Sequence, residues 1–335
     1  MTAQKNTIPV FYTITDNYTP YVGVSIQSLI NHSDPKKDYT ITVMVQDITD
    51  EHKKQLENLA TDNVHINIFH IDDKLLEPIT NIKENYLRGQ FFTLSIFYRL
   101  FIPELFPEYD KAVYLDADTI VNTDIADLYN LDIGDNMFAS APDLSIRFMP
   151  PLQKYISECQ GILPTDKYIN NGVILFDTKK FRDKKFVDRF IHLLTTYQVF
   201  TIDPDQSYMN EICEDQIYHL EKEWDAMPNE NMAEFENPKI VHYNLFYKPW
   251  HYEDVQYAKY FWDVAKNTPF YSELKKQLDS YTDEDRKQDR VDLDKMVEMF
   301  GEIKKADNNW ANIKAKGEQV KLWYLVKIDR KYLKI

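Results

Sequence analysis

The sequence predicts an α/β fold, with a mixed, mostly parallel sheet flanked by helices and a helical region at the C-terminal end. Three observations lead to this prediction. Strand-like and helix-like stretches alternate through the first third of the chain. One of the predicted strands ends on Asp116-Ala117-Asp118. Finally, 44% of the 335 residues are hydrophobic, which is enough to build a large core.

The first half of the chain accounts for most of the predicted sheet. Strands rich in β-branched and aromatic residues are expected at residues 9–15, 39–45, 64–71 and 111–115. Helices, indicated by the spacing of apolar residues or by acids in a first turn, are expected at residues 18–32, 50–60 and 93–101. Alternation of this kind is typical of parallel strands with helices on both faces of the sheet.

The second half has a more mixed pattern. Short buried strands are expected at 172–176 and 239–243, an amphipathic helix at 179–197 and a further helix at 205–214. The character of the chain then changes near residue 251. The remainder contains an aromatic helical stretch, an acidic helix or connector and a basic tail, at residues 251–278, 279–294 and 304–335. We therefore predict a main domain at 1–252 and a helical C-terminal region at 253–335.

Composition excludes several classes of function. The net charge of −15 argues against a nucleic-acid-binding protein. Only 7 glycines are present, and neither G-x-x-x-x-G-K-[ST] nor G-x-G-x-x-G occurs, so a bound phosphate must be held by a metal and side chains. Cys159 and Cys213 are too few for a disulfide framework, and no apolar signal segment precedes the first strand, so a cytoplasmic location is expected.

Asp116 and Asp118 are the strongest candidates for a functional site. They follow the apolar run 112–115, and alternation along an extended chain points both carboxylates to the same side. Carboxylate oxygens suit hard divalent cations, and ligands of open α/β sheets bind beyond the carboxyl ends of the strands. A solvated loop and helix capping by Asp118 are the ordinary alternatives.

Two other kinds of site use closely similar motifs. A calcium-binding EF-hand loop is excluded, because Val121 stands where that loop needs glycine and Asp127 where it needs glutamate. A divalent-dependent phosphatase of the haloacid dehalogenase type, with Asp116 as its nucleophile, remains an alternative. That family usually carries the motif near the N-terminus, with Thr or Val where this chain has Ile120.

Three further polar groups also follow predicted strands or begin predicted helices. In residues 242–250, His242 can bind a metal and Lys248 can bind a phosphate. The ordinary alternative is that the histidine belongs to the core and the lysine to the surface. The segment 16–18 offers an aromatic ring and small polar groups for a nucleobase, or simply a helix cap. Taken alone, the segment 170–172 predicts a turn, and the segment 205–206 predicts the start of a helix.

Taken together and in this order, these strings resemble glycosyltransferase family 8. The matching strings are Asp16-Asn17-Tyr18, Tyr98-Arg99-Leu100, Tyr114-Leu115-Asp116-Ala117-Asp118, Asn170-Asn171-Gly172-Val173, Asp205-Gln206, and His242-Tyr243 with Lys248-Pro249-Trp250. The resemblance covers roughly residues 8–252. It implies a GT-A (Rossmann-like) fold and a retaining enzyme that moves a hexose from UDP-glucose or UDP-galactose to a glycan, glycolipid or glycoprotein acceptor.

The resemblance also implies roles for individual residues. Asp116, Asp118 and His242 correspond to ligands of Mn²⁺, or of Mg²⁺ in its place. Lys248 is expected to contact the diphosphate of the donor, and Asp143 the transferred sugar. The expected contacts to uracil come from Thr15, Asn17 and Tyr18. The expected catalytic residues surround the sugar and are Arg99, Asn170, Asp205 and Gln206.

The chain departs from the family pattern at two places. Thr15 stands where many members have an acidic or small residue, so the contact to uracil is expected to differ. Many members have a glycine between the histidine and the lysine, where this chain has Leu245-Phe246-Tyr247. We expect Phe246 or Tyr247 to shape the acceptor pocket instead.

The basic tail is a separate feature. Residues 303–335 hold nine basic and three acidic side chains, interleaved with aromatic residues such as Trp310, Trp323 and Tyr324. Such a segment suits peripheral contact with an anionic membrane, here at the inner face of the cell membrane, or a helix docked on the core. A non-catalytic nucleotide-sugar-binding protein is the remaining alternative for the chain as a whole.

Overall fold

The computed structural model describes residues 7–72, 94–147, 149–318 and 320–321. Its strands are β1 Thr7–Ile14, β2 Asp38–Val45, β3 Val64–His70, β4 Ala112–Leu115, β5 Thr119–Val121, β6 Phe138–Ser140, β7 Val173–Phe176, β8 Ile217–His219 and β9 Ile240–His242. Its α-helices are α1 Thr19–His32, α2 Asp50–Glu57, α4 Tyr98–Leu105, α5 Ile125–Tyr129, α6 Leu144–Arg147, α7 Pro150–Tyr155, α8 Thr178–Asp183, α9 Phe186–Tyr197, α10 Pro204–Ile212, α11 Ala258–Ala265, α12 Tyr271–Ser280, α13 Asp283–Lys305 and α14 Trp310–Ala315. Shorter helical turns are η1 Asp16–Tyr18, η3 Leu94–Phe97, the π-turn η4 Ile156–Gln160, η5 Thr165–Lys167 and η6 Lys222–Asp225.

One large mixed sheet and one small sheet organise the fold. The large sheet has the order β3-β2-β1-β4-β7-β6-β8, and the pairs β3–β2, β2–β1 and β1–β4 are parallel. β7 pairs antiparallel with both β4 and β6, whereas β8 runs parallel to β6. The small sheet pairs β5 with β9 in antiparallel register. The prediction of a mixed, mostly parallel sheet flanked by helices is confirmed.

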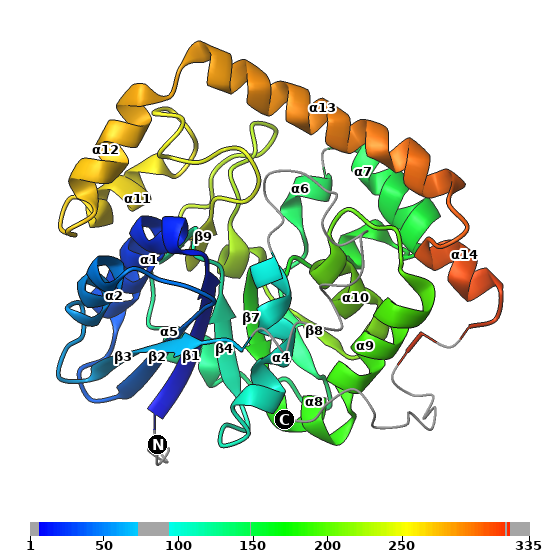
Figure 1. Cartoon of the computed structure of the whole chain (residues 1–335), viewed down its shortest axis with the longest axis horizontal. Helices are drawn as coiled ribbons and strands as arrows, with labels where there is room; N and C mark the ends of the chain where they lie inside the picture. Colours follow the sequence, from blue (N-terminus) through cyan, green and yellow to red (C-terminus); the bar gives the residue numbers. More distant parts are fainter. Residues whose placement is uncertain (1–6, 73–93, 148, 319, 322–335) are drawn as a thin grey trace.

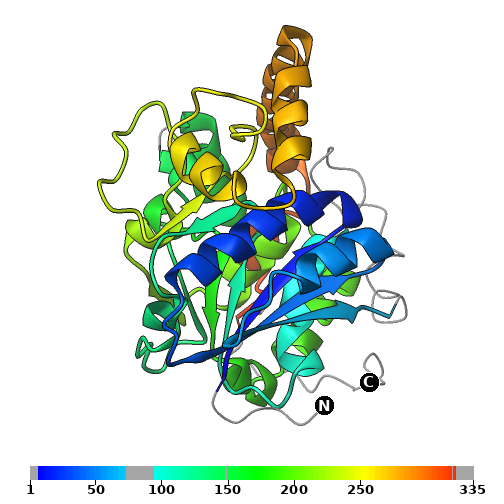
Figure 2. The same cartoon turned by 90° about the vertical axis from the view of Figure 1, so that its left-hand side faces the viewer.

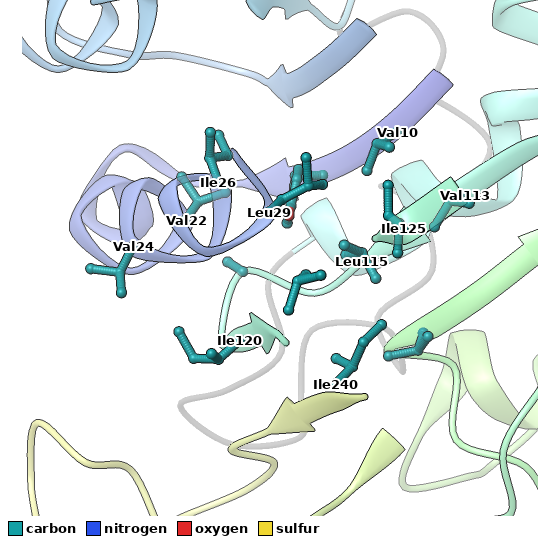
Figure 3. Packing of buried hydrophobic residues seen from close by; sticks show 14 of the residues in the cluster. Val10, Val22, Val24, Ile26, Leu29, Val113, Leu115, Ile120, Ile125 and Ile240 are labelled. Carbon is teal, nitrogen blue, oxygen red and sulfur yellow. The ribbon is translucent and has the colours of Figure 1, made fainter. Parts of the chain in front are cut away.

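Alternation along the buried strands divides the core between the two faces of the sheet. Val10 and Tyr12 of β1 pack with α1 and α11, whereas Phe11 packs with α4 and α8–α10. Figure 3 shows the first of these cores, where side chains of α1, β1, β4 and β9 converge. α1 and α2 lie side by side in both views of the molecule (Figures 1 and 2). The helices therefore cover both faces of the sheet and leave its carboxyl edge for polar residues.

The prediction of one continuous helix at 179–197 is wrong, because the structure has two helices there, α8 and α9. The chain turns at Lys185, whose φ of 56° is left-handed, so α8 ends and α9 begins in a new direction. In one continuous helix, side chains five residues apart point about 140° from each other. Here Phe181 and Phe186 both enter the same core, with ring centroids 4.6 Å apart. The break allows both rings to be buried.

Helices of the C-terminal region begin and end at residues that differ from the predicted ones. Residues 251–257 precede α11 as a loop. The acidic segment, expected as a helix or a connector, is mostly helical, because the 23-residue helix α13 begins at Asp283 and extends into the basic tail. α13 begins with a capping box formed by Thr282 and Asp285. In Figure 1 it runs across the top of the molecule, at the end toward which the parallel strands point, and Figure 2 shows it from a perpendicular direction.

The first part of the basic tail, around Trp310, packs against the core. Trp310 is 1% exposed, and its indole Nε1 donates a hydrogen bond to Ser207 at 2.5 Å while its ring contacts Tyr208 edge-on. The residues Trp323, Tyr324, Leu325 and Ile328, on which the membrane interpretation rests, lie outside the described residues. In the part of the chain that the structure describes, every helix is too short or too polar to cross a membrane.

Candidate active site

A cavity of about 380 Å³ opens beyond the carboxyl ends of β1 and β4, where the sequence places its candidate residues. All of them line this cavity: Thr15, Asn17, Tyr18, Arg99, Asp116, Asp118, Asp143, Asn170, Asp205, Gln206, His242 and Lys248. They come from segments more than 200 residues apart in the chain. The fold thus brings together every residue to which the sequence assigned a role in donor binding or catalysis.

Asp116 and Asp118 meet His242 because of the register of the small sheet. Asp116 follows β4 and Asp118 precedes β5, whose Thr119 pairs with His242 at the end of β9. His242 Nε2 lies 3.4 Å from Asp118 Oδ1 and 3.7 Å from Asp116 Oδ2. One ligand atom from each of the three residues falls within 4.8 Å of the others. This spacing suits a single bound cation.

The surroundings of His242 also fit a metal ligand. Its Nδ1 lies 3.0 Å from Asp225 Oδ1, so the proton on that nitrogen is held by a carboxylate and Nε2 is turned toward the two aspartates. A carboxylate behind a histidine is the usual support for an imidazole that binds a metal. Burial lowers the pKa of His242, but Asp225 and Asp118 outweigh burial and raise it well above its ordinary value. The site therefore attracts positive charge.

Gly172 makes room for this cluster. A Cβ at this position would lie 2.3 Å from His242 Cε1 and 2.8 Å from Asp116 Oδ2, closer than side-chain contacts allow. The absence of a side chain lets the backbone approach both residues. The donor set of two carboxylates and one imidazole, seated in a cradle that a methyl group would fill, fits Mn²⁺ or Mg²⁺.

Lys248 lies beside the acidic pair. Its Nζ contacts Asp118 Oδ2 and the carbonyl oxygen of Tyr243, and the side chain is almost fully buried. Burial raises the pKa of Asp118, but Lys248 and His242 outweigh it and keep the pKa below its ordinary range. Asp118 is therefore an anion that is already shared between two cationic groups.

Arg99 connects the acidic pair to Asp205. Its Nη2 lies 2.9 Å from Asp116 Oδ1 and its Nε lies 3.2 Å from Asp205 Oδ2. Its Nη1 also donates to the carbonyl oxygen of Asn171 at 2.7 Å. Asp205 Oδ2 further accepts a hydrogen bond of 2.7 Å from Asn171 Nδ2. Burial raises the pKa of Asp205, and Arg99 opposes that shift. Both aspartates are thus held rigidly on one guanidinium.

A second polar network fixes the remaining residues on this side of the cavity. Gln206 Nε2 donates to Asp143 Oδ2 at 3.0 Å, while Gln206 Oε1 accepts from the backbone N–H of Asn171 at 3.3 Å. Asn170 Nδ2 donates to the same Asp143 oxygen at 3.3 Å, and Asn170 Oδ1 accepts from Gly172 N–H at 2.8 Å. The orientation of both amides is therefore set by their partners.

The segment after β1 forms the opposite wall. Thr15 Oγ1 donates to Asn17 Oδ1 at 2.5 Å, and the ring of Tyr18 packs edge-on against Tyr21. Asp16 turns away from the cavity toward α2, where it accepts hydrogen bonds from Thr49 and His52. Of this motif, Thr15, Asn17 and Tyr18 line the cavity, and Asp16 anchors the turn that presents them.

Sequence reasoning missed several residues of the site. Asp225, Asn171 and Gly172 had no assigned role, although Asn171 and Gly172 stand inside one of the matching strings. In the histidine–lysine loop, Leu245 lines this cavity and has a φ of 56°. That left-handed backbone explains why a glycine suits this loop position. Phe246 and Tyr247, which are expected to shape the acceptor pocket, line a second cavity.

Comparison with known proteins identifies the family. Residues 9–254 match the model of "Glycosyl transferase family 8". The chain is 27% identical to lipopolysaccharide 1,2-glucosyltransferase of Escherichia coli K12, over 78% of each chain. Among solved structures, the bifunctional glycosyltransferase WbbM aligns with 84% of this chain and 53% of its own, with a TM-score of 0.69 and 26% identity. The galactosyltransferase LgtC aligns with 78% of this chain and 96% of its own, with a TM-score of 0.64 and 20% identity. The chain therefore has the GT-A fold and belongs to glycosyltransferase family 8.

Proposed function

We propose that the protein is a metal-dependent retaining hexosyltransferase that takes glucose or galactose from a UDP-sugar. The observation that carries this proposal is the cavity in which the Asp116, Asp118 and His242 cluster faces Lys248 on one side and the Asp205 network on the other. The family model supports the class of reaction, and the names of the relatives mention both glucosyl and galactosyl transfer.

The roles of the cavity residues follow from their chemistry. Asp116, Asp118 and His242 would hold Mn²⁺ or Mg²⁺, which when bound supplies positive charge to stabilise the departing diphosphate. Lys248 adds a point charge beside them and is proposed to bind the same diphosphate. Tyr18 is proposed to stack on uracil, with Asn17 and Thr15 bonding to its edge.

Arg99, Asp143, Asn170, Asp205 and Gln206 are proposed to surround the transferred sugar. As the bond between C1 and the diphosphate oxygen breaks, the sugar gains positive charge, which the Asp205 carboxylate stabilises. Arg99 and Asn171 both contact Asp205 Oδ2, which makes that oxygen a weaker nucleophile toward carbon. Gln206 Oε1 already accepts a hydrogen bond and is a weak nucleophile.

Retention is therefore proposed to occur by attack on the same face of the sugar. The acceptor oxygen forms its bond to C1 while the diphosphate oxygen leaves, and the proton of the acceptor hydroxyl passes to that departing oxygen. Intact-protein mass spectrometry with a slow 2-fluoro donor is expected to show unmodified enzyme. A glycosyl adduct on Asp205 would contradict the same-face mechanism.

The proposed function is tested by release of UDP from a panel of UDP-sugars, with Mn²⁺ and with EDTA. Hydrolysis of one donor, abolished by EDTA, is the expected result, and it identifies the sugar. A non-catalytic binding protein would bind UDP but release none from any donor when acceptor glycans are also supplied. Turnover of aryl phosphates would instead support the phosphatase alternative, which family membership argues against.

Replacing Asp225 by Asn should weaken metal binding without removing a ligand. Asp225 is fully buried and is the carboxylate that orients His242, and loss of such a partner typically costs 10–100-fold in metal affinity. Titration of Mn²⁺ by electron paramagnetic resonance measures the change. The matched control is Glu223→Gln in the same turn η6, which should leave Mn²⁺ affinity within twofold. An Asp225→Asn variant with unaltered Mn²⁺ affinity would contradict the role assigned to His242.

The rest of the chain and its setting are also proposals. We propose that residues 1–252 are the catalytic unit and that 253–335 are an accessory helical region, whose Phe261 and Trp310 both enter cores built on the sheet. The acceptor is proposed to be a glycan, glycolipid or glycosylated protein at the cytoplasmic side of the cell membrane. Of the tail 304–335, the part beyond Lys321 is proposed to contact anionic lipid, and its deletion should abolish sedimentation with phosphatidylglycerol vesicles. Sedimentation that persists after the deletion would exclude the contact.

A further inference from the structure

A second cavity of about 330 Å³ lies beneath α13, beside the candidate active site. Its walls are the loop 228–230, the loop 246–256 and one face of α13. α13 begins at Asp283, beyond the residues 9–254 that match the family model. One wall of this cavity is therefore built by a part of the chain that the family model does not include.

The two cavities are neighbours along α13. Met296 lines the first cavity and Leu293 lines the second, and residues three apart on a helix lie on the same face. On the other side, Leu245 lines the first cavity, whereas Phe246 and Tyr247 line the second. The two cavities therefore lie next to each other, with α13 on one side and the loop at 245–247 on the other.

The walls of the second cavity combine aromatic rings with hydrogen-bonding groups. Tyr247 is 39% exposed and its ring centroid lies 6.0 Å from that of Tyr252. The Arg286 guanidinium lies 5.5 Å from the Tyr252 ring centroid. Arg286 Nε is buried and has no hydrogen-bond partner among the described residues. Asp289 accepts hydrogen bonds from Tyr252 and Tyr281, which fixes the carboxylate in the wall.

The charges of this cavity indicate the class of ligand. The cavity is lined by two basic residues, Arg286 and Arg290, and by three acidic ones, Glu230, Asp254 and Asp289. A phosphate or another anion would meet a net negative surface, so it is disfavoured. A neutral polyhydroxyl ligand can accept from the arginines, donate to the carboxylates and lay its C–H face on a tyrosine ring.

We propose that the cavity beneath α13 is a carbohydrate subsite that binds the acceptor at a sugar remote from the reacting hydroxyl. This inference rests on the proposed function, since it takes the first cavity as the place of transfer. It implies that the acceptor is an oligosaccharide rather than a single sugar, and that α13 contributes to the choice of acceptor.

The test uses the full chain, labelled and applied with UDP and Mn²⁺ to a microarray of mono-, di- and trisaccharides. Wild type is expected to bind a subset of the di- and trisaccharides. Tyr247→Ala and Arg290→Ala, both at exposed positions, should lower the ratio of oligosaccharide to monosaccharide binding by about tenfold, which corresponds to about 1.4 kcal/mol. The control is Lys287→Ala, on the same helix but absent from the cavity wall, which should keep the ratio within twofold.

Each contrary outcome overturns the inference. It fails when wild type binds no oligosaccharide on the array, when the two variants bind oligosaccharides as wild type does, or when they lose mono- and oligosaccharide binding equally. Release of UDP from the donor, measured on the same wild-type preparation, separates the two proposals. Donor hydrolysis with an unchanged ratio defeats the subsite alone, whereas absence of both donor binding and hydrolysis defeats the proposed function.

Discussion

Asp118→Ala is expected to lower the rate of Mn²⁺-dependent UDP release by about 1000-fold, or about 4 kcal/mol of transition-state stabilisation. The Asp118 carboxylate lies 3.4 Å from His242 Nε2 and also contacts Lys248, so it interacts with both cationic groups of the site. Its loss removes one ligand of the proposed cation and alters the position of the lysine. Steady-state release of UDP, measured over a range of Mn²⁺ concentrations, gives the size of the effect.

Interpretation of this variant needs a measure of folding. Lys248 is almost fully buried, and removal of its partner leaves an unpaired charge in the interior, which is strongly destabilising. Asp118→Asn keeps the shape and an acceptor oxygen, so it should fold better while still losing the negative charge. Asp127→Asn, an exposed acid nearby in the chain, is the control and should retain full activity. A folded Asp118→Asn variant with wild-type Mn²⁺ dependence would exclude the metal site.

The sequence was sufficient to place the candidate residues because of where they stand in the chain. Asp116 follows a buried strand, and His242 ends one whose partner is the strand after Asp118. The carboxyl ends of the parallel strands β1 and β4 meet at one edge of the large sheet, and the antiparallel pairing of β9 with β5 brings His242 to that edge. The roles of Arg99, Asp143 and Asp205, by contrast, came only from the resemblance of the ordered strings to glycosyltransferase family 8.

The supporting residues lacked any such signal. Asp225 lies 17 residues before His242 in a short helical turn, and nothing in the neighbouring sequence distinguishes this buried aspartate from an acid on the surface. Leu245 adopts a left-handed backbone conformation, which glycine adopts far more readily than leucine. A leucine at this position therefore gives no indication of that conformation in the sequence. The break at Lys185 follows from a requirement to bury Phe181 and Phe186 together, which is a tertiary demand.

Replacing Gly172 by Ala should impair the site although alanine is the smallest possible addition. The new Cβ would lie 2.3 Å from His242 Cε1 and 2.8 Å from Asp116 Oδ2, so at least one of the two must move. His242 is buried and tied to Asp225, and Asp116 is held by Arg99 and Tyr114. Small-to-large changes in such packed places typically cost about 1–3 kcal/mol of stability. We expect Mn²⁺ affinity to fall at least about tenfold and UDP release about 100-fold, because ligands displaced by about 1 Å no longer meet one cation.

Gly301→Ala provides the matched control for this prediction. Gly301 lies in α13, and a methyl group added to it would meet no atom within 4 Å, so alanine should stabilise the helix by about 0.5–1 kcal/mol. The two variants add the same methyl group to the same residue type, and differ only in what that group meets. Thermal unfolding and Mn²⁺ titration of both variants separate loss of fold from loss of site. A Gly172→Ala protein that binds Mn²⁺ as tightly as wild type would show that Asp116 and His242 do not share a cation, whatever its activity.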